Sequence, residues 1–352
     1  MVPKLLMLTE SNPRHSCPAP PVDWKKLVSK YRRPSNQKAV IQIINTIGAY
    51  LVSWVMMYFA LRISWWLVVP FILLAGSLLV RTFIIFHDCC HGSFLESRRA
   101  NHVLGFLSGV LTFTPYYHWR WEHTLHHASS GDLDRRGVGD IWTMTLAEYV
   151  GSGKRTRFLY RISRNPFVMF AVAPVFLLFI YQRFSGRNAK ARERCSVWLM
   201  NLAISFIYAV AAWFFGPREF FIILTSVAMI AGGVGVWLFY VQHQFEDVIW
   251  ERKKGWEFAA AAMQGSSYYK LPGILQWISG NIGFHHIHHL CPQIPNYNLQ
   301  ACHESDAFFS SVPPVTLRES WKTTRLKLWD EKNRRLVGFS AVGRAAAWPV
   351  QK

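Results

Sequence analysis

The sequence has few charged residues and lacks the short motifs of several common cofactor sites. Charged residues make up 17% of its 352 positions, whereas hydrophobic residues make up 51%. No CxxC pair, HPGG motif or GxGxxG fingerprint occurs. These absences exclude a haem domain of the HPGG type, a dinucleotide-binding domain and an iron–sulfur site built on a CxxC pair. The six cysteines also have no disulfide spacing, so we expect reduced thiols with structural roles.

Four long apolar segments contain almost no charge, and this pattern predicts a membrane protein. A helix needs about 20 apolar residues to cross the hydrocarbon core of a bilayer. The segments of this length are residues 40–61, 64–86, 196–215 and 220–242. A short turn joins the members of each pair, so the sequence predicts an all-α integral membrane protein with four transmembrane helices in two hairpins.

The basic residues behind the net charge of +19 lie between these segments. Residues 120–164 contain eight Lys or Arg and residues 183–194 contain five, but each hairpin turn contains only one. The positive-inside rule places both turns outside and everything else, including both termini, in the cytoplasm. Basic residues gathered in this way suit anionic lipid headgroups, so we expect no nucleic acid partner. Residues 1–38 have no apolar core long enough for a cleavable signal peptide.

Three histidine clusters have the spacing of metal ligands. His87 and His91 are four residues apart, so they share one face of a helix at the inner end of the second predicted span. Two further clusters place histidines at i, i+3 and i+4, and their members are His123, His126, His127, His285, His288 and His289. Neutral imidazole binds Fe, Zn and Cu, and eight nitrogen donors are too many for one four- or six-coordinate ion. The clusters therefore predict two metal ions.

Other metal proteins would arrange these residues differently. A structural zinc ion uses a closed four-ligand site, usually with cysteine. A membrane metal transporter or sensor places histidines within its spans, along a pathway. A shared metal site instead requires all three clusters on one side of the membrane. The shorter apolar stretches 103–117 and 166–182 are therefore predicted to be re-entrant or interfacial helices, and prolines interrupt the second.

The motifs HxxxH, HxxHH and HxxHH, separated by two helical hairpins, resemble those of the membrane fatty acid desaturase superfamily. Further segments resemble bacterial acyl-lipid desaturases, including FIIFHDCCH at 83–91 and GVWLFYVQHQFE at 235–246. The chain looks most like the delta-5 type of bacilli and more distantly like delta-12 (omega-6) enzymes. The resemblance covers about residues 38–339. It defines a predicted desaturase domain at 39–339, with an N-terminal segment at 1–38 and a C-terminal tail at 340–352.

The resemblance implies a cytoplasmic helical cap that holds a non-haem di-iron centre, bound by the eight histidines of the three clusters. It also implies a ninth ligand, His243, because related enzymes place a histidine at the cytoplasmic end of the fourth span. Animal members carry an asparagine one turn earlier, where this chain has Phe239. The other histidines that we considered are expected not to bind metal, and they are His15, His102, His118, His286 and His303.

Ligand imidazoles need a hydrogen-bond partner for their second ring nitrogen. The candidates for this role close to the clusters are Asp88, Asp132, Asp134, Asp140, Glu246, Asp247 and His286.

The resemblance also implies the reaction, an O2-dependent introduction of a cis double bond into fatty acyl chains of membrane lipids. Each turnover takes two electrons, and the missing cofactor motifs indicate a separate donor, which in bacterial relatives is a ferredoxin or flavodoxin. These donors are acidic, and a basic stretch offers them a surface: Lys154, Arg155, Arg157, Arg161 and Arg164. The alternatives are a delta-12/omega-6 desaturase and a lipid or alkyl hydroxylase of the same superfamily. The expected location is a bacterial inner membrane.

Overall fold

Four long helical segments dominate a computed structural model of the protein, in which residues 22–345 are described. Each is long and apolar enough to cross a membrane. The segments are Asn36–Leu61, Trp65–His91, Ala191–Phe215 and Pro217–His243. The first consists of α2 (Asn36–Ile43), η2 (Ile44–Gly48) and α3 (Ala49–Leu61), and the others are α4, α10 and α11. The predicted all-α integral membrane fold with four spans is therefore confirmed.

Local signals fix the ends of α4 and α11. The Ser64 hydroxyl accepts a hydrogen bond from the backbone N–H of Trp66 at the start of α4. Gly92, with φ of 70°, ends α4 in the left-handed conformation that glycine adopts without a steric penalty. Pro217 stands in the first turn of α11, where its missing N–H breaks no helical hydrogen bond. Because α4 runs five residues beyond the predicted end at 86, the first histidine pair lies on the span helix itself.

The shorter apolar stretches do not form straight spans. α5 (Arg98–Leu111) packs against α4 and is too short to cross a bilayer. α8 (Lys154–Ser163) precedes a second piece that contains η3 (Val168–Val172), α9 (Ala173–Phe179) and η4 (Tyr181–Arg183). The two pieces together have the length and apolarity of a span, but they are bent by 63° at residues 164–167. Pro166 lies in this bend, where it favours an interruption of the helix.

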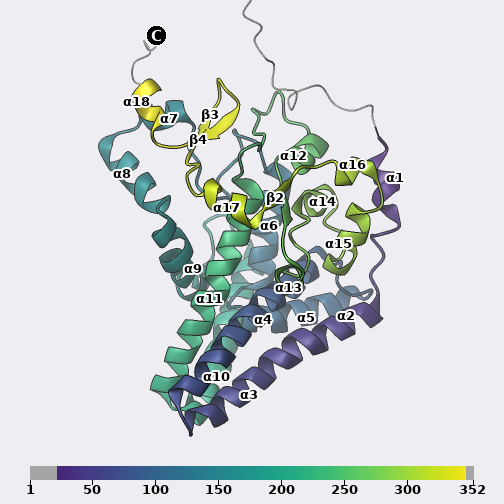
Figure 1. The fold of residues 1–352 in the computed structure, drawn as a ribbon. Coiled ribbons are helices and arrows are strands. Elements are labelled where there is room, and N and C mark those ends of the chain that lie inside the picture. Colours follow the sequence, from purple (N-terminus) through teal and green to yellow (C-terminus); the bar gives the residue numbers. More distant parts are fainter. Residues whose placement is uncertain (1–21, 346–352) are drawn as a thin grey trace, which may run out of the picture.

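Short elements cover the end of the long helices where the histidines lie, and we call them together the cap (Figure 1). Its helices are α6 (Tyr116–Ser129), α7 (Leu146–Gly151), α12 (Phe258–Gln264), α13 (Gly273–Ile278), α14 (His285–Leu290), α15 (Asn296–His303), α16 (Ala307–Ser310), α17 (Leu317–Thr323) and α18 (Ala341–Ala345). Its strands are β1 (Tyr268–Lys270), β2 (Pro314–Thr316), β3 (Leu328–Asp330) and β4 (Arg335–Val337). β1 pairs with β2 in parallel, and β3 pairs with β4 in antiparallel orientation. α1 (Trp24–Ser29) packs on one side of the cap.

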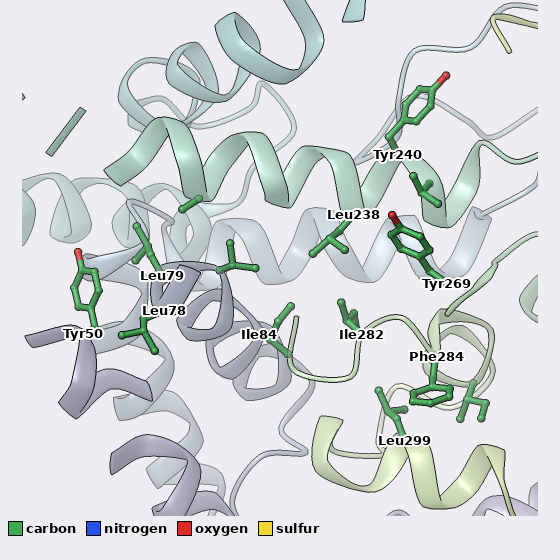
Figure 2. Close-up of a cluster of buried hydrophobic side chains, with 14 of the residues drawn as sticks. Tyr50, Leu78, Leu79, Ile84, Leu238, Tyr240, Tyr269, Ile282, Phe284 and Leu299 are labelled. Atoms are coloured by element: carbon green, nitrogen blue, oxygen red, sulfur yellow. The ribbon is translucent and has the colours of Figure 1, made fainter. Parts of the chain in front are cut away.

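One hydrophobic core runs from the spans into the cap (Figure 2). Leu78 of α4 and Leu238 of α11 belong to it, and so do Ile282 and Phe284, which immediately precede α14. Leu299 of α15 completes this side of the core. Burying these side chains together holds the cap helices at a fixed height above the ends of α4 and α11.

Candidate metal centre

Four helices bring the predicted histidine ligands together. α4 and α11 contribute from the span side, through His87, His91 and His243 at their last turns. α6 and α14 contribute from the cap, and each carries one i, i+3, i+4 set of histidines. In each set, the residues at i and i+4 share a helix face and form a pair. The residue at i+3 is rotated by about 100° from the one at i+4.

The nine histidines form two groups. In each group, one ring nitrogen from every member lies within 4.8 Å of the others. The first group consists of His87, His91, His123, His127 and His288. The second consists of His126, His243, His285 and His289. The groups adjoin where the rings of His127 and His289 stack with centroids 4.2 Å apart.

Distances between ring nitrogens suit metal ligands. The Nε2 atom of His127 lies 3.0 Å from that of His123 and 3.1 Å from that of His288. A ring nitrogen has one in-plane direction for a proton or lone pair, so it cannot hydrogen-bond well to both neighbours. Two nitrogens bound about 2.0–2.1 Å from one ion at tetrahedral or octahedral angles would lie about 2.9–3.4 Å apart. The same convergence occurs at His243, whose Nε2 lies 3.2 Å from that of His126 and 3.0 Å from that of His285.

Burial keeps five of the predicted ligands on α6 and α14 neutral. It lowers the pKa of His123 and His127 on α6 well below the ordinary value, and the neighbouring imidazoles add to the effect. The pKa values of His285, His288 and His289 on α14 are lowered for the same reasons. Neutral imidazole is the form that binds metal.

Seven buried ring nitrogens of histidines have no hydrogen-bond partner among the described residues, and two of them, one in each group, are Nε2 of His91 and Nε2 of His289. An unsatisfied buried polar atom costs about 1–3 kcal/mol. A bound metal ion would satisfy both, so the residues present fit two metal ions.

Two of the predicted carboxylates contact histidines of the groups. Asp88 Oδ1 lies 3.0 Å from Nδ1 of His87, and its other oxygen accepts hydrogen bonds from the backbone and side-chain N–H of Asn296. Asp140 Oδ1 lies 2.7 Å from Nδ1 of His126. A carboxylate at Nδ1 directs the Nε2 lone pair of each ring toward the centre of its group.

The other predicted partners lie elsewhere. Asp132 is buried and binds Arg135, while Asp134 is exposed and binds Arg252 and the backbone N–H of Lys253. Glu246 and Asp247 are exposed in the segment that follows α11. Among the described residues, Asp132, Asp134 and Glu246 make no hydrogen bond or ion pair with the rings of the two groups.

The remaining histidines lie outside both groups. Nε2 of His286 faces Nδ1 of His303 at 3.3 Å, and burial lowers the pKa of His286 to about 3. His118 accepts a hydrogen bond from the backbone N–H of Gly186, and Nδ1 of His102 lies 3.2 Å from the hydroxyl of Tyr116. His15 and Cys17 lie outside the described residues, and the other five cysteines are free.

Some residues around the site were not recognisable from the sequence. The ring of Phe239 packs against both His126 and His243, with centroids 5.3 Å away in each case. A hollow beside His243 is lined by Ser130, Arg136, Asp140, Phe239, Gln244 and Trp250. The contact between Asn296 and Asp88 could not be predicted from the sequence, because the two residues are 208 positions apart and only the fold brings them together.

The position of Arg164 contradicts one expectation from the sequence. This residue was assigned to a basic surface for the electron donor, but its side chain is buried. Its guanidinium donates to the side chain of Gln244 at 2.8 Å and to the backbone carbonyl of Leu326 at 3.0 Å. Arg164 therefore ties α8 to α11 and the cap.

Fold and site together define an integral membrane protein whose clustered histidines suit a two-metal centre. Comparison with known proteins makes the class specific. The fatty acid desaturase family pattern matches residues 63–313. The chain is 44% identical over 317 residues to a fatty acid desaturase of Bacillus subtilis (strain 168), and the match covers 90% of each chain.

More distant relatives have more specific names. The sn-1 oleoyl-lipid 12-desaturase of Synechocystis sp. is 26% identical, over 81% of this chain and 77% of that protein. The sn-1 acyl-lipid omega-3 desaturase (ferredoxin) of Nostoc sp. is 25% identical, over 83% of this chain and 77% of that protein. The chain belongs to the fatty acid desaturase family. The predictions that it is an oxidoreductase and a member of this superfamily are confirmed.

Proposed function

We propose that the protein uses two non-haem iron ions and O2 to introduce a cis double bond into fatty acyl chains of membrane lipids. The two groups of converging imidazoles are the observation that carries this proposal. A methylene C–H bond has no acidic proton, so a side chain cannot remove its hydrogen by acid–base chemistry. The step needs a redox-active cofactor, and zinc has no redox chemistry.

The groups assign a ligand set to each ion. His87, His91, His123, His127 and His288 would hold the first ion, and His126, His243, His285 and His289 the second. When bound, the two ions would supply the activation of O2 and the abstraction of hydrogen. Asp88 and Asp140 orient His87 and His126, and Phe239 covers two rings of the second group with an apolar face.

The overall reaction requires a partner that donates electrons. Two hydrogens leave adjacent carbons of the acyl chain, and with O2, two protons and two electrons from outside they yield two waters. The Nostoc relative is named for ferredoxin, which supports a ferredoxin or flavodoxin as the donor here. The name of the Synechocystis relative includes an oleoyl lipid, and this supports acyl lipids as substrates of the present protein.

We propose the delta-5 position for the new double bond, from the resemblance to the bacillus type of acyl-lipid desaturase. Relatives named as 12- and omega-6 desaturases match the chain at 26% and 24% identity, so a delta-12 or omega-6 position is the second candidate. A hydroxylase of the same superfamily is a further alternative, because the same oxidant can return oxygen to the carbon.

We also propose the orientation. The basic residues concentrate on the side of the cap, and each hairpin turn has one, so the positive-inside rule puts the cap and both termini in the cytoplasm. For a bacterial protein this means that the metal centre faces the cytoplasmic side of the inner membrane.

Expression in a host that lacks unsaturated lipids tests the proposal. Mass spectrometry of derivatised fatty acids should show a new double bond and its position, and a hydroxyl group instead would favour the hydroxylase. The purified protein should contain about two irons per chain. His126→Ala should abolish desaturation and lower the iron content, whereas His102→Ala should retain both. Stoichiometric zinc without O2-dependent activity would contradict the proposal.

A further inference from the structure

The segment before the first span carries a concentration of positive charge. Between residues 23 and 39, all of which the structure describes, there are six basic residues and one acidic residue, Asp23. All six basic side chains are exposed, and none lies within ion-pair distance of a described carboxylate. They are Lys25, Lys26, Lys30, Arg32, Arg33 and Lys38. We call residues 23–38 the basic strap.

The basic strap is held firmly on the cap. Val28 is 1% exposed and belongs to the main core, and the ring of Trp24 packs against that of Phe258. The side chain of Asn298 donates hydrogen bonds to the backbone carbonyls of Tyr31, at 3.0 Å, and Arg33, at 3.3 Å. The exposed charges therefore stand on an ordered surface.

This surface differs from the other basic helix, α8. α8 carries Lys154 and Arg155 but also exposes Phe158, Leu159 and Ile162, with 63%, 47% and 40% of their surfaces accessible. Basic and apolar side chains exposed on one helix are typical of a helix that lies in the membrane interface. Figure 1 shows α8 and α1 on opposite sides of the molecule.

The basic strap has the character of a surface for a soluble partner. Within residues 23–39, which are fully described, no large hydrophobic side chain is exposed, whereas Val22 and Val40 on either side are 37% and 47% exposed. Exposed positive charge without apolar exposure attracts an acidic protein from solution and inserts no side chain into lipid.

A short bonded path leads from the basic strap to the first histidine group. Asn298, which binds the strap backbone, lies two residues from Asn296 on α15. The backbone and side-chain N–H groups of Asn296 donate to Asp88 at 2.6 and 2.9 Å, and Asp88 contacts Nδ1 of His87 at 3.0 Å. The strap is thus linked to a metal-binding ring through a single turn of α15 and one carboxylate.

We propose that the basic strap is the docking surface for an acidic one-electron carrier protein. This inference rests on the proposed function, which needs two electrons per turnover from outside. Two successive docking events would each deliver one electron, and the two electrons are consumed with O2 and two protons as described above. The path through Asn296 and Asp88 gives electrons a bonded route to the first group. The donor surface expected on α8 is assigned to the membrane interface instead.

Paired charge reversals test the proposal. Lys26→Glu with Arg33→Glu changes the strap by four charges, and Lys154→Glu with Arg155→Glu makes the same change on α8. An acidic [2Fe–2S] ferredoxin serves as the probe, with the purified enzyme in lipid nanodiscs. The strap variant should bind oxidised ferredoxin about tenfold more weakly at low salt, with the difference shrinking at high salt. Its KM for reduced ferredoxin should rise similarly, with kcat little changed.

The α8 variant should keep the affinity and KM of the unchanged protein within about twofold. Equal affinities of the strap variant and the unchanged protein would overturn the proposal, and so would a larger effect of the α8 variant. A chemical reductant, reduced methyl viologen, separates this inference from the proposed function. All three proteins should desaturate equally with it, and failure of the unchanged protein would count against the desaturase mechanism and not against the strap.

Discussion

At the scale of single residues, the centre depends on which nitrogen of each imidazole faces inward. The Nε2 atoms of His123, His127 and His288 converge on one point, and those of His126, His243 and His285 on another. A ring can hold this orientation only if its other nitrogen or its flank is fixed by the protein. Asp88 and Asp140 do this for one ring in each group.

Replacing Asp140 by Asn should weaken metal binding at the second group. The carboxylate contacts Nδ1 of His126 at 2.7 Å, and loss of such a partner costs about 10–100-fold in metal affinity. Iron content after dialysis against a graded chelator measures the effect. Asp134→Asn is the matched control, because Asp134 binds Arg252 at the surface. Equal iron retention by both variants would show that Asp140 does not support the ligand.

Lys327 gives the fold a dependence on pH. Burial, with the Arg164 cation close by, lowers the pKa of Lys327 from its ordinary 10.5 to about 8. Between pH 8 and 10.5 the unfolded chain binds more protons at this residue than the folded chain, so stability should rise with pH across this window. Lys327→Met should flatten the rise in melting temperature between about pH 8 and pH 9.5. An unchanged slope in the variant would assign the dependence to other groups.

At the scale of elements, sequence patterns located the helices better than they located the partners of the site. The four spans were predicted within a few residues, because an apolar run of about 20 residues with at most one charge is typical of a transmembrane helix and of little else. The predicted span stopped at residue 86 although a helix was expected at His87 and His91, since the segment HDCCH contains polar and charged residues. The hydrogen bond from the backbone N–H of Asn296 offsets the cost of burying the Asp88 carboxylate. Only the fold brings these two residues together.

The same limit applies to the nine histidines, whose gathering could be predicted although their division into two groups could not. Spacing within α6 and α14 indicates ligands, but the way that two cap helices face two span ends is a tertiary property. Charge patterns were ambiguous for a similar reason. Arg164 has the same sequence signal as its exposed neighbours, yet it is buried against Gln244 and Leu326.

The contrast between α8 and the basic strap can be measured directly. In a background where Cys17 and Cys195 are replaced by serine, a nitroxide label at Phe158→Cys should be accessible to O2 dissolved in lipid. A label at Lys26→Cys should be accessible to a water-soluble nickel complex instead. The physical reason for this difference is that α8 exposes large hydrophobic side chains, whereas residues 23–39 expose none. Water exposure of both labels would remove α8 from the membrane interface.

At the scale of the whole molecule, spans and cap share one hydrophobic core (Figure 2). The metal groups lie where span ends meet cap helices, so a bound ion joins the two parts. Removal of iron with bipyridyl should therefore lower the melting temperature of the purified protein. An ion that binds only the folded state stabilises it by about 2.7 kcal/mol at a free concentration of about 100 Kd.

The variant that carries both His126→Ala and His243→Ala should lose most of this stabilisation, because α6 and α14 supply ligands to both groups and disruption of the second group would also loosen the first. Scanning fluorimetry of the iron-loaded and iron-free proteins measures both shifts. Identical melting temperatures with and without iron would show that the groups do not bind it tightly in the folded state.

The division of each cap helix between the two groups affects how the protein acquires its metal. α6 gives a pair of rings to the first group and one ring to the second, and α14 does the reverse. The first ion to bind would order both α6 and α14, and it would therefore also order the ligands of the group that is still empty. Singly loaded molecules should therefore be scarce during maturation. Loss of one ion would loosen the other, so the centre would be assembled and dismantled as a unit.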